Sequence, residues 1–242
     1  LKSFADERHI AVVLVHHLNK MKDVSDPYDR ISGSTGLMGA ADTLMVSNAG
    51  SAAISAVSLV DSINVLMIYV FTALATGGAI VCAQYLGRGD DYEATENARQ
   101  MLFTVLAISV LVSIVCIALN RPLLRLIFGT VERDVMDASI TYFLITAASY
   151  PFIALYNAGA ALFRVDGNSR LPMTVSTICN LINIGGNALL IFTFKMGAAG
   201  AALSTLASRV LSGVAVMYFL RQEGRTIVVR DYFSIRPQPK RI

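Results

Sequence analysis

A stretch of some forty residues, Ser47 to Leu86, contains one charged side chain, that of Asp61. No water-soluble helix is this apolar on every side, and the stretch exceeds the roughly 20 residues that cross a bilayer. It therefore predicts a membrane-spanning helix with an interfacial segment before it. The composition agrees, because the chain is 55% hydrophobic and 15% charged, whereas soluble domains carry about 25% charged residues.

Four further apolar runs predict four more spans. They are Met101–Leu119, Ala138–Phe163, Met173–Phe194 and Ala198–Leu220, with polar loops or turns between them. Pro151 falls inside the third run, where neighbouring helices and water can satisfy the carbonyl that a proline frees. The predicted fold class is an all-α polytopic membrane protein with five transmembrane helices, preceded by a short α/β fragment.

Lysine and arginine residues predict the orientation. Ten of them follow the first, third and fifth spans, namely Arg88, Arg99, Arg164, Arg170, Arg221, Arg225, Arg230, Arg236, Lys240 and Arg241. Four lie on the other side, namely Arg121, Arg125, Arg133 and Lys195. By the positive-inside rule the first set and the C-terminal tail are cytoplasmic. The residues before Ser47 would then start outside, unless they form a sixth span.

The segment before Ser47 has a different character. Ile10–Val15 is a short, β-branched apolar run bounded by polar residues, which is typical of a buried parallel strand. The run VVLVHHLNK, followed by DPYDRISGSTGLMGAADTLMV, resembles the C-terminal part of a RecA-like ATPase of the hexameric plasmid-replication helicase type. An alternative function is therefore a nucleotide-binding replication ATPase fragment fused to a membrane segment. The chain has no G-x-x-x-x-G-K-[ST] loop, so we expect no ATP hydrolysis.

A second resemblance covers residues 41–242. The segments AADTLMVSNAGSAAISAVSLVDSINVL, ATGGAIVCAQYLGRGD, NLINIGGNALLIF and MGAAGAALSTLASRV resemble, in order and spacing, the N-terminal lobe of the multidrug and toxic compound extrusion (MATE) family. The resemblance implies a twelve-helix secondary antiporter of two six-helix lobes in the cell (inner) membrane. It exports drugs or organic cations in exchange for Na⁺ or H⁺, so we expect no enzyme and no cofactor beyond the coupling ion.

These two resemblances predict three regions. Residues 1–46 are a partial ATPase-like fragment, 47–220 a MATE-like membrane lobe, and 221–242 a cytoplasmic linker to a second lobe. Both resemblances include Ala41–Val46, and two unrelated genes joined at such a shared string would produce this pattern. The expected partners are the lipid bilayer, small amphipathic or cationic substrates, and a second MATE lobe or a homodimer partner. No basic surface indicates nucleic acid.

The resemblance implies a coupling-ion site. Asp42, in the run Asp-Thr-Leu-Met-Val, matches the family's ion-site aspartate, and the alternative is a water-exposed aspartate at the end of an ATPase strand. Asn183 and Asn187 match the polar positions that pair with it, and their spacing of four places them on one helical face. Several relatives carry an aspartate at the later position. The alternative role of these asparagines is hydrogen bonding between helices.

A second group of polar residues is expected to face a cavity of the lobe. Asp61 lies inside the first span, where a charge costs about 3 kcal/mol, so we expect it to face water or ligand unless the helix begins only near Ser62. Asn64 and Asn180 are its expected neighbours. Tyr150, Tyr156 and Asn157 are expected to flank the same cavity by resemblance to the family.

The remaining reactive side chains predict no site. Cys82, Cys116 and Cys179 lie in separate apolar runs without metal-ligand spacing, as small buried hydrophobic residues do. His9, His16 and His17 are interpreted as surface or strand-end residues. We therefore expect no catalytic residue and no metal site. The glycines of the pairs Gly77-Gly78 and Gly185-Gly186 are interpreted as helix-packing positions.

Overall fold

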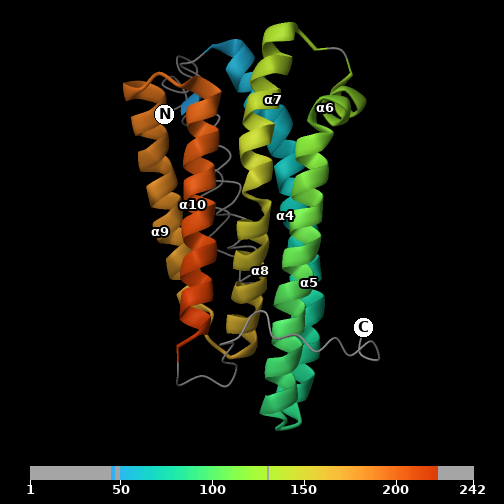
Figure 1. Cartoon of the computed structure of the whole chain (residues 1–242). Coiled ribbons are helices and arrows are strands. Elements are labelled where there is room, and N and C mark those ends of the chain that lie inside the picture. Colours follow the sequence, from blue (N-terminus) through green and yellow to red (C-terminus); the bar gives the residue numbers. More distant parts are fainter. Residues whose placement is uncertain (1–44, 47–49, 130, 223–242) are drawn as a thin grey trace, which may run out of the picture.

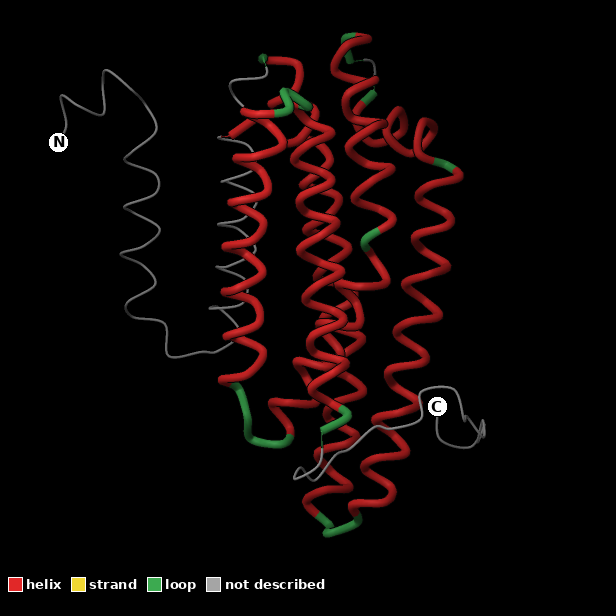
Figure 2. The backbone as a smooth tube through the Cα atoms, turned by 60° about the vertical axis from the view of Figure 1, so that its left-hand side comes forward, coloured by secondary structure: helices red, strands yellow, loops and turns green. Residues whose placement is uncertain are grey.

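The computed structural model describes residues 45–46, 50–129 and 131–222, and every regular element in these ranges is helical (Figure 1). The elements run in chain order as α4 (Ser51–Gly87), α5 (Asp91–Ala118), α6 (Asn120–Phe128), α7 (Arg133–Ala148), α8 (Tyr150–Val165), α9 (Arg170–Asn187), the π-helix η2 (Ala188–Thr193) and α10 (Gly197–Leu220). The long helices run side by side as a bundle, seen from two sides in Figures 1 and 2.

The helices α4 and α5 form a long antiparallel hairpin. α4 has 37 residues, which corresponds to about 55 Å and exceeds a bilayer core of about 30 Å. The turn after it includes Gly89, whose φ of 76° favours glycine. Asp90 then caps α5 by accepting a hydrogen bond from the backbone N–H of Glu93 at 3.0 Å. The expected loop over residues 87–99 is therefore wrong from Asp91 onward, because this cap starts the helix early.

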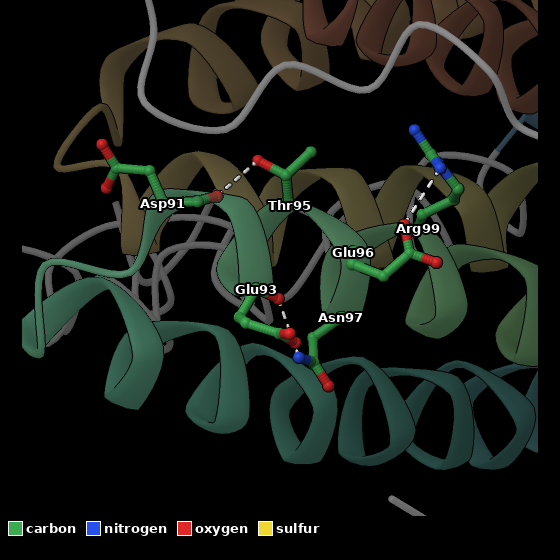
Figure 3. A network of polar contacts seen from close by, with 6 residues as sticks. All are labelled: Asp91, Glu93, Thr95, Glu96, Asn97 and Arg99. Atoms are coloured by element: carbon green, nitrogen blue, oxygen red, sulfur yellow. Dashed lines mark hydrogen bonds and ion pairs between the residues drawn. The ribbon is translucent and has the colours of Figure 1, made fainter. Parts of the chain in front are cut away.

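The first turns of α5 lie outside the apolar part of the hairpin. The side chains of Thr95 and Asn97 donate to the carbonyls of Asp91 and Glu93, and Arg99 pairs with Glu96 at 3.0 Å (Figure 3). These bonds all stay within α5. The polar segment thus extends the helix beyond the apolar run, while Ala94 and Ala98 on its other face are buried against the bundle.

The third predicted span is bent. α7 ends at Ala148, α8 begins at Tyr150, and the two helices meet at 44°. Pro151 occupies the first turn of α8, where its missing N–H has no intrahelical partner to lose. The backbone therefore breaks at Ser149, and together the two helices have the length of one span.

The fourth span changes its winding before it ends. α9 passes at Ala188 directly into the π-helix η2, and the two form one apolar element, Arg170–Thr193. A turn follows in which Lys195 has a φ of 53°, and α10 then returns antiparallel to α9. π-Helical turns are rare and often occur at functional sites.

Small residues bring the helices close together in the centre of the bundle. A Cβ at Gly78 or at Gly186 would collide with the side chains of Met101 and Ser204, which confirms these two as packing positions. Gly77 and Gly185 instead have nothing within 4 Å. The outer surface is apolar, with large exposed side chains such as those of Leu66, Leu111 and Leu181, as expected where lipid replaces water.

The five predicted spans are confirmed, since four helices are long and apolar enough to cross a membrane and the bent pair makes a fifth. The sequence missed α6, a nine-residue helix between α5 and α7. Met45 and Val46 are helical, and Val46 is buried in the core of the bundle. The expected strand Ile10–Val15, the three histidines and the C-terminal linker beyond residue 222 lie outside the described residues.

Candidate functional site

Asp61 is the centre of a polar cluster between α4, α7 and α8. Its Oδ1 atom accepts a hydrogen bond from the Tyr142 hydroxyl at 3.0 Å and another from Asn64 Nδ2 at 3.2 Å. The hydroxyl of Tyr150 donates to Asn64 Oδ1 at 3.0 Å. Asn64 is three residues after Asp61 and thus on the same face of α4. Asn64, one of the two expected neighbours of Asp61, and Tyr150, an expected cavity residue, are therefore in one network with it.

The hydrogen bonds of this cluster all point toward the carboxylate. Tyr150 donates to Asn64, Asn64 donates to Asp61, and Tyr142 donates to Asp61. Donors that converge on an acceptor hold it in place. The second oxygen, Oδ2, is buried and has no hydrogen-bond partner. The protein thus satisfies one carboxylate oxygen with hydrogen bonds and leaves the other buried without a donor.

The surroundings of the cluster are apolar and aromatic. Asn64, Tyr142 and Tyr150 are almost completely buried, and the Tyr150 ring packs edge-on against Phe71 with 5.9 Å between the centroids. Cys116 on α5 is buried as well. The tyrosines direct their hydroxyl groups toward Asp61 and Asn64, so the carboxylate lies between polar tips of otherwise apolar side chains.

A buried arginine lies near the same place. Arg209, in the middle of α10, is 7% exposed, and its Nη1 atom donates to Ser149 Oγ at 2.8 Å. Its charge acts on both Asp61 and Tyr150. Asp61 and Arg209 are the only Asp, Glu, Lys or Arg residues of α4 and α10. Charged side chains inside membrane spans are costly and mark functional sites.

The two asparagines expected at the coupling site form a separate polar seam between α9 and α10. Asn183 and Asn187 are both fully buried, and Asn187 Nδ2 donates to Asn183 Oδ1 at 3.4 Å. Asn183 Nδ2 contacts Thr205 Oγ1 at 3.3 Å, and the Ser204 hydroxyl donates to the Asn183 carbonyl at 2.7 Å. The seam ends where α9 turns into η2. The third expected member, Asp42, lies outside the described residues.

The other expected cavity residues are not joined to Asp61 by hydrogen bonds. The Tyr156 hydroxyl donates to the Pro172 carbonyl at 3.0 Å and ties α8 to α9. Asn157 is buried, and its Nδ2 atom has no hydrogen-bond partner. Asn180 is half-buried on α9, and no hydrogen bond connects it to another described side chain. Asn157 is thus a second buried polar group with an open hydrogen-bonding position.

Sequence reasoning missed Tyr142, Ser149, Arg209, Ser204 and Thr205. A signal existed for Arg209, because it interrupts an otherwise uncharged span. No such signal exists for Tyr142, which lies 81 positions from its partner Asp61. The three buried cysteines are free, which confirms them as small apolar residues. Among the described residues, no group of His, Cys, Asp or Glu could hold a metal ion.

Several long apolar helices with buried ionisable and amide side chains between them define a lobe of a multi-pass membrane transporter. The chain belongs to the MATE family: the family model MatE matches residues 34–189. The match includes Ala41–Val46, the part shared by the two resemblances, and so assigns these residues to the transporter family. The ATPase-like interpretation of the preceding residues lies outside the described part of the chain and remains a prediction.

The relatives support this assignment. The chain is 32% identical over 190 residues to the uncharacterized transporter YisQ of Bacillus subtilis, which covers 76% of this chain and 41% of YisQ. It is 29% identical over 176 residues to the multidrug resistance protein PmpM of Pseudomonas aeruginosa, covering 71% of this chain and 36% of PmpM. The chain thus spans less than half the length of the curated relatives it matches.

Solved structures share the fold. A crystal structure of MATE in the bent conformation aligns with a TM-score of 0.79 at 22% identity, over 86% of this chain and 46% of that one. An inward-facing MATE transporter of the MOP superfamily aligns with a TM-score of 0.76 at 24% identity, over 81% of this chain and 44% of that one. The described helices therefore adopt the fold of about half a MATE transporter.

Proposed function

We propose that this chain forms one lobe of a secondary antiporter that exports drugs or organic cations in exchange for Na⁺ or H⁺. The observation that carries the proposal is the Asp61 carboxylate, which is buried among membrane helices. Its Oδ1 atom accepts two hydrogen bonds, and its Oδ2 atom has no hydrogen-bond partner. A carboxylate inside a membrane is costly unless it binds a cation or a proton. Tyr142 and Tyr150 add rings that suit an organic cation.

The coupling ion would bind at the seam between α9 and α10. In this proposal Asp42 supplies the charge, and Asn183 and Asn187 supply amide oxygens. Asn187 carries no charge, so only one carboxylate would act here. Binding of the ion would bias the lobe between inward-open and outward-open states, because a ligand shifts an equilibrium only by its differential affinity for the two states.

A single lobe is not a complete carrier. Alternating access needs two repeats or bundles that move against each other, and the relatives of this chain are more than twice as long as the part it matches. The other bundle would be a second MATE lobe or a second copy of this chain. The proposed location is the cell (inner) membrane with the C-terminal tail in the cytoplasm, on the same side as Arg88, Arg164 and Arg170.

The proposal is tested with the purified chain in detergent and in lipid vesicles. We expect a cationic dye such as ethidium to bind the chain, and Na⁺ or acid to displace it. We expect no dye transport by vesicles that hold the chain alone as a monomer, and cross-linking in the same vesicles tells whether dimers are present. The proposal is wrong if a neutral dye of similar size binds as well as the cation, or if neither Na⁺ nor acid affects binding.

A further inference from the structure

A cavity of about 670 Å³ lies at the end of the bundle, between α6 and the start of α7. Its charged lining consists of Arg121 and Arg125 from α6 and of Arg133 and Asp137 from α7. Met136 and Ile140 supply part of the apolar wall. Asp61 does not line the cavity, although Ile140 of the cavity wall is two residues before Tyr142, which contacts Asp61. None of the lining residues has a role in the proposed transport.

The three guanidinium groups are not neutralised by the described protein. The ion pair of Arg99 with Glu96 lies at the other end of α5, and no described carboxylate forms an ion pair with Arg121, Arg125 or Arg133. No side-chain hydrogen bond involves Arg121, Arg125 or Arg133. Glu132 and Asp134 flank Arg133 in the sequence, but they do not line the cavity. The lining thus contains three positive charges and one negative charge, which is an environment for an anion.

The position of the cavity narrows the choice of anion. α6 follows the end of the membrane span α5 after one residue and lies at the side of the bundle, next to the first half of α7 (Figure 1). Leu126 and Ile127 of α6 are 83% and 52% exposed, so apolar side chains point outward beside the arginines. Short amphipathic helices of this kind lie in the membrane interface, with apolar side chains among the acyl chains and basic ones among the headgroups.

The three arginines lie on the predicted non-cytoplasmic side, where the positive-inside rule predicts few basic residues. Three of the four lysines and arginines on the predicted non-cytoplasmic side line this one cavity. Orientation therefore does not explain their presence. Arginine forms two parallel hydrogen bonds to a phosphate group, and basic pockets beside membrane helices bind anionic lipid headgroups.

From the charge of the lining and its place at the interface, we propose that this cavity binds the phosphate group of an anionic phospholipid. The guanidinium groups contact the phosphate oxygens, and the acyl chains run down the lipid-facing side of the bundle next to Leu126 and Ile127. A lipid held there would tie α6 to the start of α7. The site has the same chemistry as one for free phosphate, and the two sources differ in whether acyl chains contribute.

Native mass spectrometry of the full chain in a neutral detergent tests the proposal. Phosphatidylglycerol and phosphatidylcholine with the same acyl chains are added separately, and the lipid adducts are counted as the concentration rises. We expect preferential retention of phosphatidylglycerol. Each of the substitutions Arg121→Gln and Arg125→Gln should weaken it about fivefold, and the double variant about 25-fold. The matched control is Arg88→Gln with Arg170→Gln, two arginines at the opposite end of the bundle, which should change nothing.

Three results would overturn the proposal. The first is equal retention of the two lipids, and the second is an equal loss in the control variant. The third is full displacement of phosphatidylglycerol by inorganic phosphate at the same concentration, which would indicate a site for free anions rather than for a lipid. Circular dichroism of each variant verifies that it is folded, and the two single variants provide the same test if the double variant does not fold.

Discussion

Arg209 Nη1 donates a hydrogen bond to Ser149 Oγ at 2.8 Å, at the bend between α7 and α8. The same hydroxyl donates to the Thr146 carbonyl at 2.5 Å, which also accepts the backbone N–H of Ser149 at 3.0 Å at the end of α7. The buried guanidinium group of α10 is thus held at Ser149, where the neighbouring span breaks between α7 and α8. The positive charge of Arg209 also acts on Asp61. Arg209 therefore links the bend at Ser149 to the candidate cation site.

Ser149→Ala should destabilise the chain by about 2 kcal/mol. The substitution removes a hydrogen bond to a buried charged group, because alanine has no oxygen that can accept from the Arg209 guanidinium. The measurement is unfolding by sodium dodecyl sulfate in mixed micelles, followed by circular dichroism. Ser169→Ala is the matched control, since Ser169 is an exposed serine at a helix start whose side chain makes no capping bond. Equal stability of the two variants would show that the Arg209 contact contributes nothing.

Asp61→Asn should weaken ethidium binding about tenfold or more, because the substitution preserves the shape and removes the charge that attracts a cation. Tyr142→Phe should weaken it less, since one donor is lost while the carboxylate stays. Fluorescence titration of the purified variants measures both effects. Tyr69→Phe is the control on the same helix, because Tyr69 is 56% exposed and outside the network. Undiminished binding by Asp61→Asn would remove Asp61 from the proposed site.

The membrane fold could be predicted from the sequence because hydropathy reports it directly. Five apolar runs gave five spans, and the single charge in the first run pointed to Asp61. What failed were the helix limits outside the bilayer. The residues Asp91–Arg99 and α6 are polar or short, so hydropathy does not distinguish them from loops, and only the Asp90 cap and the packing of Leu124 in the core show that they are helical.

Of the contacts in the site, only those between residues of the same helix could be predicted from the sequence. Asn64 follows Asp61 by three positions, so their contact follows from helical geometry. Tyr142 and Arg209 reach the site from other helices, and nothing in a single sequence tells which face of α7 or α10 points toward α4. The π-helix after Asn187 could not be predicted either, because the run ALLIFT has no feature that distinguishes a π-helix from an α-helix.

Asn183→Ala should destabilise the bundle by about 1 kcal/mol, because the amide contacts Ser204 and Thr205 of the facing helix, and hydrogen bonds between membrane helices are worth roughly 0.6 to 1.7 kcal/mol. Asn180→Ala, one turn earlier on the same helix, should change stability little. The comparison uses the same unfolding assay. If the two substitutions cost the same, the seam between α9 and α10 has no special role in stability.

Gly213→Ala should destabilise the packing of α8 against α10. A Cβ at Gly213 would lie 2.8 Å from the carbonyl oxygen of Phe152, and this neighbour is backbone, so it cannot turn away as a side chain would. Forcing the helices α8 and α10 apart should cost about 1 to 3 kcal/mol. Gly185→Ala places the same methyl group in open space and should be neutral or slightly stabilising, because alanine favours helix more than glycine does. Equal unfolding midpoints for the two variants would mean that α8 and α10 do not pack through Gly213.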